Sequence, residues 1–339
     1  MYKELHKTPG AGYWKRLLLE QFIEPAIVCQ KDSMAITDNE KLRVFKKYVN
    51  IINIETSSYC NRKCNYCPVS QYDRYSEKKY MSDIVFTKII NDLRSIQYNS
   101  TLCLNLYNEP LADNHIFDRI KQIKKSIPNS LIFFNSNGDY LTVPIIEKLS
   151  EIGPVIINVT LHQKPDEEYN DEDRIKHFRK FFKKLNIPFK IDTLIPEKTI
   201  KTSFKQNGIK IMVNAINYNE SGNSRSGIIK HLIPKQIRTN PCLRPFREIT
   251  IDYNGDSWPC CNIFPDAPQN INYKIANLQD SNLFDIYINE KMNYFRRMLF
   301  IFSEKESICK FCSDPDNSEI TSKKQRDEIL QTAMNYGEK

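Results

Sequence analysis

Short apolar runs alternate with longer amphipathic segments between about residues 49 and 214. Six runs have the composition of strands, namely "VNIINIET", "TLCLNLY", "SLIFFNS", "PVIINVTL", "IPFKIDTLI" and "GIKIMVN". Four of the segments between them carry apolar residues at helical spacing: "SDIVFTKIINDLRSI", "DNHIFDRIKQIKKSI", "TVPIIEKLSEI" and "DEDRIKHFRKFFKKL". The fifth connection, "PEKTIKTSFKQN", has only a weak helical pattern. Strands that alternate with helices predict an α/β fold with a parallel sheet, here an open, partial (β/α)6 TIM-like barrel. The first helix has Ser82 as a plausible N-cap.

The pattern changes after residue 214. "NYNESGNSRSG" is polar and predicts a loop, and "FREITIDYNGDSWPCC" places two strand-like runs around Asn254-Gly255, a hairpin signal. "SNLFDIYINEKMNYFRRMLFIF" then has helical spacing. We therefore expect an N-terminal extension over 1–47 with a helix at "GYWKRLLLEQFI", a core barrel over 48–214, a small α+β domain over 215–315 and a polar tail over 316–339.

Composition and charge restrict the class of protein without naming its function. The chain has 339 residues, of which 40% are hydrophobic and 27% charged, which is typical of a globular protein in water. Its net charge of +8 suits an anionic partner, but the basic residues are dispersed, which favours a solvated surface over a nucleic-acid site. The N-terminal apolar run is broken by Glu20, Glu24 and Pro25. We therefore expect no signal peptide, no membrane partner and a cytoplasmic location, where ten cysteines indicate metal binding or catalysis rather than disulfides.

The stretch "ETSSYCNRKCNYCPVS", directly after the first predicted strand, contains Cys60, Cys64 and Cys67. Three thiolates on a cubic 4Fe–4S cluster leave one iron free for a small molecule. A zinc site completed from elsewhere in the chain and unliganded thiols are the alternatives. We favour the iron–sulfur interpretation, because three cysteines this close in a cytosolic chain are rarely without a ligand.

These residues resemble the signature of the radical S-adenosylmethionine (radical SAM) superfamily, Cys-x3-Cys-x-aromatic-Cys, with Tyr66 at the aromatic position. The resemblance implies that the free iron binds the amino and carboxylate groups of S-adenosylmethionine. It also implies that an electron from the reduced cluster cleaves the sulfonium, and that the resulting 5′-deoxyadenosyl radical abstracts hydrogen from the substrate. Such a radical needs a closed cavity with little water.

Further positions resemble the family less specifically. Glu109 in "YNEPL" matches the acidic position that holds the amino group of S-adenosylmethionine, although Asn108 replaces a glycine there. Asn137 in "NSNG" matches a third-strand Thr-Asn-Gly, with a plain turn as the alternative. Thr160 falls where many members contact the ribose. Arg174 resembles an arginine that meets the carboxylate, and a surface ion pair is the preferred alternative.

A second set of cysteines comprises Cys242, Cys260, Cys309 and Cys312. Their spacing around "NGDSWPCC" and "ICKFC" resembles the twitch module, the short relative of the SPASM domain, which implies one closed auxiliary 4Fe–4S cluster. Structural zinc is the alternative, and Cys261 could replace Cys260 as a ligand. Cys29 and Cys103 are most simply buried small residues.

The resemblance implies a two-cluster radical SAM oxidoreductase, supplied with electrons by a reducing partner such as flavodoxin or ferredoxin. The auxiliary cluster would accept an electron while a sugar- or cyclitol-like small molecule is dehydrogenated. The alternatives are maturation or epimerisation of a ribosomally made peptide, with Cys103 as a hydrogen donor if it faces the barrel, and a basic nucleic-acid-binding metalloprotein. No single base stands out among five candidates for removing the proton: His162, Lys164, Asp192, Arg225 and Arg244.

Overall fold

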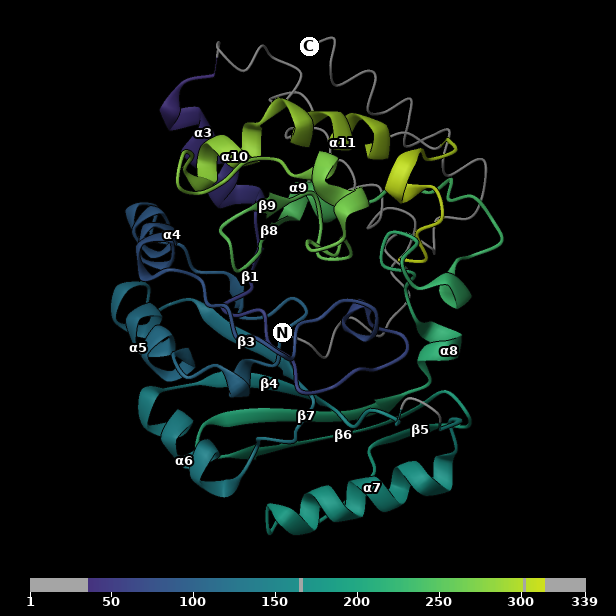
Figure 1. Ribbon diagram of the computed structural model, residues 1–339. Helices are drawn as coiled ribbons and strands as arrows, with labels where there is room; N and C mark the ends of the chain where they lie inside the picture. Colours follow the sequence, from purple (N-terminus) through teal and green to yellow (C-terminus); the bar gives the residue numbers. More distant parts are fainter. Residues whose placement is uncertain (1–35, 165–166, 301–302, 315–339) are drawn as a thin grey trace, which may run out of the picture.

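A computed structural model describes residues 36–164, 167–300 and 303–314 of the chain (Figure 1). A single sheet of nine strands runs through this part of the molecule in the order β5-β6-β7-β4-β3-β2-β1-β8-β9. The predicted helix at "GYWKRLLLEQFI" and the polar tail lie outside the described residues. Among the helices of the described ranges, none combines the length and the apolar character needed to cross a membrane.

The first half of the sheet is parallel, as predicted. Its strands are β1 (Ile51–Ile54), β2 (Thr101–Cys103), β3 (Leu131–Ser136) and β4 (Val155–Thr160). Each is followed by a helix: α4 (Asp83–Ser95), α5 (Ile116–Ser126), α6 (Val143–Ile152) and α7 (Asp171–Lys184). A further helix, α3 (Asp38–Tyr48), precedes β1. The N-cap at Ser82 is confirmed, because Ser82 Oγ accepts a hydrogen bond from the Val85 amide at 3.3 Å.

The partial barrel is confirmed, but the last two of the six predicted units differ. The short edge strand β5 (Thr193–Ile195) pairs antiparallel with β6 (Thr199–Gln206), which pairs antiparallel with β7 (Ile209–Ile216). No part of "IPFKIDTLI" is therefore a parallel strand, because only its last three residues form a strand, the antiparallel β5, and the expected fifth connection forms β6 instead of a helix. The physical reason is the dipeptide Asn207-Gly208, whose φ angles of 50° and 82° suit a tight hairpin turn. Strand β7 restores the parallel direction beside β4.

Opposite faces of the parallel strands differ in chemistry. Ile52, Leu102, Ile132 and Ile157 point outward and are wholly buried in the core shared with the helices. The inner face instead carries asparagines, and the register pairs Asn135 of β3 with Asn158 of β4. Because side chains alternate along a strand, the inner face also includes Phe133 and Ile156, and the asparagines follow them toward the C-terminal ends of β3 and β4.

The C-terminal part continues the same sheet. Strand β8 (Glu248–Ile251) pairs parallel with β1, and β9 (Ser257–Trp258) pairs antiparallel with β8 across the predicted Asn254-Gly255 turn. The predicted long helix is divided at Asn289, which has an extended backbone, into α10 (Leu283–Ile288) and α11 (Glu290–Phe300). The loops contain α8 (Tyr218–Ser221), α9 (Arg244–Arg247) and the 3₁₀ turns Pro68–Ser70, Pro110–Ala112, Lys230–Leu232, Pro268–Tyr273 and Ser307–Cys309. The predicted boundary at residues 214 and 215 stays a prediction.

Candidate functional site

A cavity of about 270 Å³ lies where the segment after β1 crosses the C-terminal ends of the parallel strands. We call it the cysteine cavity. Its lining includes all three cysteines of the first cluster, which are Cys60, Cys64 and Cys67. Also in the lining are five of the other six residues singled out from the sequence: Tyr66, Asn108, Glu109, Asn137 and Thr160. The fold therefore brings together residues that are up to 100 positions apart along the chain. Their individual roles stay predictions.

The loop that carries the three cysteines is fixed by its own backbone and by one buried arginine. The Cys67 amide donates to the Cys64 carbonyl at 2.9 Å, and the Cys60 amide donates to the Arg74 carbonyl at 3.2 Å. The Arg74 guanidinium is only 1% exposed and forms ion pairs with Glu55 at the end of β1 and with Asp266 in the C-terminal part. Sequence reasoning missed Arg74, because nothing in the pattern distinguishes it from a surface arginine.

The surroundings of Cys60, Cys64 and Cys67 suit a metal cluster that is held by several thiolates. Burial, with a smaller contribution from the nearby Cys67, raises the pKa of Cys60 to about 12 and that of Cys64 to about 11. Thiolates in such surroundings require a neutralising cationic ligand, and the thiolate is the form that binds metal. Among the described residues, no three His, Cys, Asp or Glu side chains converge closely enough to hold one metal ion. Cys60, Cys64 and Cys67 instead share one cavity, and this arrangement suits an iron–sulfur cluster.

Glu109 lies at the N-cap of the Pro110–Ala112 turn with its carboxylate facing the cavity. The amide of Leu111 and the hydroxyl of Ser136 donate to Oε1 at 3.1 and 2.9 Å, and the amide of Asn137 donates to Oε2 at 2.7 Å. Despite these donors, burial raises the pKa of Glu109 to about 7. Asn108, at the expected glycine position, uses its amide to contact Ser57 Oγ at 3.4 Å.

The "NSNG" segment is a tight turn that also lines the cavity. Gly138 has a φ of +78°, and a Cβ there would lie 2.8 Å from Val159 Cγ1, so glycine is required on both grounds. Asn137 Nδ2 donates to Asn61 Oδ1 of the cysteine loop at 2.7 Å. The segment is therefore a turn, which was one alternative from the sequence, and it also lines the cavity, as the resemblance to the family's Thr-Asn-Gly segment implied.

Aromatic side chains close one wall of the cavity. Tyr66 stacks on Tyr218 with ring centroids 4.4 Å apart, and its hydroxyl lies 2.8 Å from His162 Nδ1. Burial and the charge of Arg62 lower the pKa of His162 to about 3, so this imidazole is neutral at ordinary pH. A neutral, weakly basic imidazole positions the Tyr66 ring better than it removes a proton.

Arg174 is not among the residues that line the cavity. It is fully buried, and its Nη2 donates to Glu167. The ion pair that the sequence offered as the alternative is therefore present, although Arg174 lies inside the fold rather than on the surface. Contact between Arg174 and S-adenosylmethionine stays a prediction that this geometry does not support.

The five candidate bases are separated by the fold. Only His162 and Arg225 line the cysteine cavity. Lys164 lines a neighbouring hollow, Asp192 is bonded to Thr202 and Ser203, and Arg244 lies beside the second set of cysteines.

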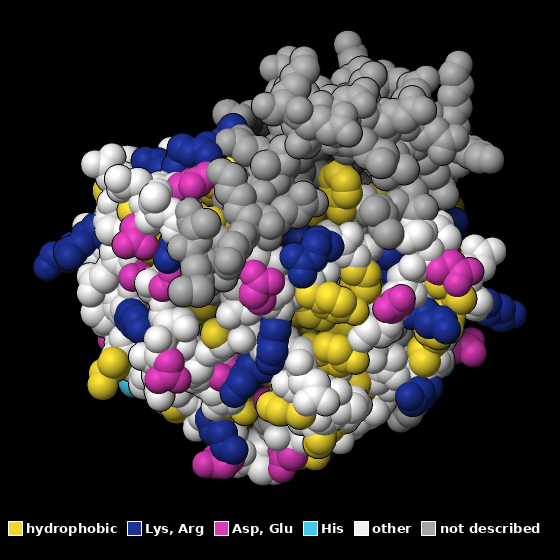
Figure 2. All heavy atoms as spheres, turned by 90° about the horizontal axis from the view of Figure 1, so that it is seen from above, with side chains coloured by type: hydrophobic (Ala, Val, Ile, Leu, Met, Phe, Trp, Pro, Cys, Tyr) yellow, Lys and Arg dark blue, Asp and Glu magenta, His cyan; other side chains and the backbone are white. Residues whose placement is uncertain are grey.

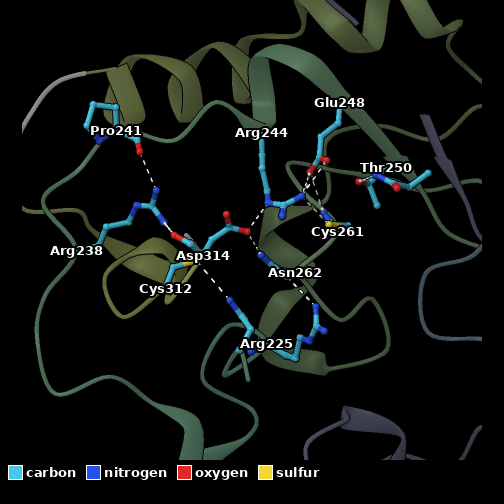
Figure 3. Close-up of polar contacts among 12 residues, drawn as sticks. Arg225, Arg238, Pro241, Arg244, Glu248, Thr250, Cys261, Asn262, Cys312 and Asp314 are labelled. Carbon is cyan, nitrogen blue, oxygen red and sulfur yellow. Dashed lines mark hydrogen bonds and ion pairs between the residues drawn. The ribbon is translucent and has the colours of Figure 1, made fainter. Parts of the chain in front are cut away.

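The second set of cysteines also meets in one place. Cys242, Cys260, Cys309 and Cys312 line a small second pocket, from which Cys261 is absent. Cys261 is held outside it by Arg244, whose Nη1 donates to Cys261 Sγ at 3.2 Å (Figure 3). Burial raises the pKa of Cys242 to about 12 and that of Cys309 beyond its usual range. Four cysteines that line one pocket suit an iron–sulfur cluster.

Arg225 links the two sites. From the sequence it was only a candidate base, and this structural role was not predicted. Its side chain lines the cysteine cavity, and its Nη1 donates at 2.7 Å to Oδ1 of Asn262, which lines the second pocket (Figure 3). No sequence signal could have placed it there, because the contact joins side chains 37 positions apart in two separate loops.

Comparisons with known proteins agree with this arrangement. The profile of the radical SAM superfamily matches residues 54–188, and that of SPASM, an iron–sulfur cluster-binding domain, matches residues 242–314. The S-adenosyl-L-methionine-dependent 2-deoxy-scyllo-inosamine dehydrogenase of Niallia circulans is 25% identical over 287 residues, which cover 84% of this chain and 99% of that protein.

Solved structures share the fold. The structure of BtrN in complex with AdoMet and 2-DOIA superimposes with a TM-score of 0.59 at 22% identity, covering 79% of this chain and 94% of that one. BtrN in an open conformation gives a TM-score of 0.51 at 20% identity with the same coverage.

Proposed function

Because this chain carries a radical SAM domain followed by an iron–sulfur cluster-binding SPASM domain, we propose that it is a radical SAM oxidoreductase that dehydrogenates a cyclitol- or sugar-like alcohol. The observation that carries the proposal is the lining of the cysteine cavity. Three thiols, a buried carboxylate and a hydroxyl from different strand ends face one space. The similarity to an aminocyclitol dehydrogenase supports the substrate class.

The proposed ligands follow from the two cavities. Cys60, Cys64 and Cys67 hold the first 4Fe–4S cluster, and Glu109, Asn137 and Thr160 bind S-adenosylmethionine beside it. Cys242, Cys260, Cys309 and Cys312 hold the auxiliary cluster. When bound, the first cluster and S-adenosylmethionine supply a hydrogen-abstracting radical, and the auxiliary cluster supplies an electron acceptor. A one-electron donor protein such as flavodoxin or ferredoxin is part of the proposal.

The chain's own residues prepare the cavity for this chemistry. The Tyr66–Tyr218 stack covers one wall and excludes water, and the neutral His162 holds the Tyr66 hydroxyl. Oxidation of an alcohol to a ketone removes one hydrogen atom, one electron and one proton. The half-buried cation Arg225, between the two cavities, favours a substrate oxygen that bears negative charge as its proton leaves.

The face of the molecule shown in Figure 2 lacks the concentrated basic patch of a nucleic-acid site among its described residues. On the face shown in Figure 2, Lys and Arg side chains are spread among acidic ones rather than gathered into one stripe. An electrostatic footprint for a phosphate backbone would be a concentrated basic patch.

Anaerobic reconstitution tests the proposal directly. We expect the purified chain to release 5′-deoxyadenosine from S-adenosylmethionine under dithionite, and to form a ketone, detected by mass spectrometry, from a panel of inositols and aminocyclitols. Cys64→Ala should abolish both reactions, whereas Cys103→Ala, a matched change outside the cavity lining, should retain cleavage. Cleavage with oxidation of a peptide and no polyol would overturn the substrate class, and cleavage by Cys64→Ala would overturn the cluster assignment.

A further inference from the structure

Four asparagines and a threonine form a continuous ladder of side chains across the inner face of the sheet. Thr160 Oγ1 donates to Asn214 Oδ1 at 3.1 Å, and Asn214 Nδ2 donates to Asn158 Oδ1 at 2.8 Å. Asn158 Nδ2 then donates to Asn135 Oδ1 at 2.9 Å, and Asn135 Nδ2 donates to Asn105 Oδ1 at 3.3 Å. The ladder thus crosses β7, β4 and β3 and ends just after β2.

The direction of the ladder is fixed by one backbone group. The amide N–H of Asn135 donates to Asn105 at 2.8 Å, so the receiving atom must be the oxygen Oδ1. Each following side-chain amide is then oriented by its neighbour, and all the donors point the same way. Hydrogen bonds aligned head to tail polarise one another, which strengthens the donor at the end of the series.

That terminal donor is Asn105 Nδ2. Asn105 Oδ1 already accepts from the backbone and side chain of Asn135 and from Cys103 Sγ at 3.4 Å. Within the described part of the chain, Asn105 Nδ2 has no acceptor, and it is not one of the fully enclosed atoms without a partner, which is consistent with an atom that opens onto the cavity. Asn105, Asn135, Asn158 and Thr160 all line the cysteine cavity. A donor that opens onto a cavity and has no protein acceptor is available to a ligand or to water.

A purely structural role does not explain the ladder. Asparagine is depleted in strands, and an apolar inner face would close a small barrel more simply. Here the helix-facing side of the same strands is entirely apolar at Ile132 and Ile157, so the polar residues are confined to the face that borders the cavity.

We propose that this ladder is the hydrogen-bonding surface that recognises the hydroxyl groups of the substrate, and that Asn105 Nδ2 donates to one substrate oxygen. The inference rests on the proposed function and names the residues that determine its specificity for a polyhydroxylated ring. Thr160, at the other end, is the proposed contact of S-adenosylmethionine, so the ladder leads from that ligand to the space beside it. A site with fixed amide donors and acceptors rejects analogues that lack the matching hydroxyl.

Binding to the oxidised, cluster-loaded enzyme tests the inference without turnover. Isothermal titration would measure S-adenosylmethionine first, and then 2-deoxy-scyllo-inosamine and scyllo-inositol in its presence. Asn105→Leu and the milder Asn105→Ser should weaken polyol binding by about tenfold or more, and S-adenosylmethionine binding by no more than about twofold. Asn53→Leu is the matched control, because Asn53 is equally buried on the inner face of β1 but bonds Thr250 and does not line the cavity.

The outcomes separate the two proposals. Unchanged polyol binding in both Asn105 variants, an equal loss in Asn53→Leu, or a parallel loss of S-adenosylmethionine binding would overturn the ladder's role while the proposed function stands. A wild-type chain that cleaves S-adenosylmethionine but binds neither polyol contradicts the proposed substrate class itself. If Asn105→Leu fails to load iron, polyol binding by Asn105→Ser decides whether the ladder recognises the substrate.

Discussion

At the scale of single residues, the cavity contains charged groups whose ionisation is set by burial. Glu109 is 2% exposed and has donors on both carboxylate oxygens, yet its pKa is raised to about 7 because desolvation outweighs those hydrogen bonds. A carboxylate with a pKa near neutrality changes charge within the range of ordinary assays. Its proposed partner, the amino group of S-adenosylmethionine, donates N–H hydrogen bonds most strongly to the charged carboxylate.

This predicts a pH-dependent affinity for S-adenosylmethionine. Below the raised pKa, Glu109 is neutral in the free protein, so the dissociation constant should rise as pH falls from 7 to 5.5, by up to about tenfold per unit. Equilibrium dialysis with the cluster-loaded enzyme measures it. Glu109→Gln should bind more weakly at pH 7 and lose the pH dependence. A variant that keeps the wild-type slope would exclude Glu109 as the titrating group.

At the scale of elements, the segment between β1 and α4 is held by an ion pair at its centre. Arg74 reaches Glu55, which is fully buried, and also Asp266, and it packs over the ring of Phe264 at 4.6 Å. Glu55 Oε1 in turn accepts from the amide of Tyr107 at 2.8 Å. One side chain therefore anchors the cysteine loop to β1, to the segment after β2 and to the C-terminal part.

Removing this arginine should destabilise the whole fold. Arg74→Met leaves the Glu55 carboxylate buried without its cation, and losing one partner of such a pair costs about 3–5 kcal/mol. Urea unfolding of the cluster-free chain gives the free energy of unfolding. The control is Arg94→Met on the exposed end of α4, which should change it by less than about 0.5 kcal/mol. Equal effects of the two substitutions would show that the buried pair contributes little.

At the scale of the whole molecule, the loops that carry the two cysteine sites are attached to one continuous sheet of nine strands. Pairing of β8 with β1 places the second pocket beside the first cavity, and the contact of Arg225 with Asn262 spans the space between them. In the proposed reaction, an electron would pass from a substrate in the cysteine cavity to an acceptor in the second pocket, and this adjacent arrangement suits that transfer. The pocket also distinguishes the adjacent cysteines, because Cys260 lines it and Cys261 does not.

Iron analysis can test that distinction. The reconstituted wild type should hold about eight irons, from two 4Fe–4S clusters, and Cys309→Ser should hold about four. That variant should still release 5′-deoxyadenosine in the absence of substrate but form no ketone. Cys261→Ser is the matched control and should keep the full iron content. Loss of iron from Cys261→Ser, or four irons with one zinc in the wild type, would contradict the proposed ligand set.

Local patterns in the sequence were sufficient for much of the architecture. The alternation of apolar runs and amphipathic segments predicted the first four strands and helices, and Asn254-Gly255 predicted the β8–β9 hairpin, because both signals act over a few residues. Asn207-Gly208 is also a hairpin signal, but the apolar pattern before it was interpreted as a helical connection, so the prediction for the β6–β7 hairpin region was wrong. Cysteine spacing along one loop indicated the first site, whereas the second, whose cysteines run from Cys242 to Cys312, was expected from the resemblance to the twitch module.

Only the tertiary structure decided which distant side chains meet. The asparagine in each strand was visible in the sequence, but its meaning depends on the register that stacks Asn135 beside Asn158. The placement of Arg174 in an ion pair and of Arg225 between two pockets likewise depends on how whole elements pack. Period and spacing are properties of the chain over short distances, whereas burial, partner choice and pKa arise only once separate strands have been brought to one edge of a sheet.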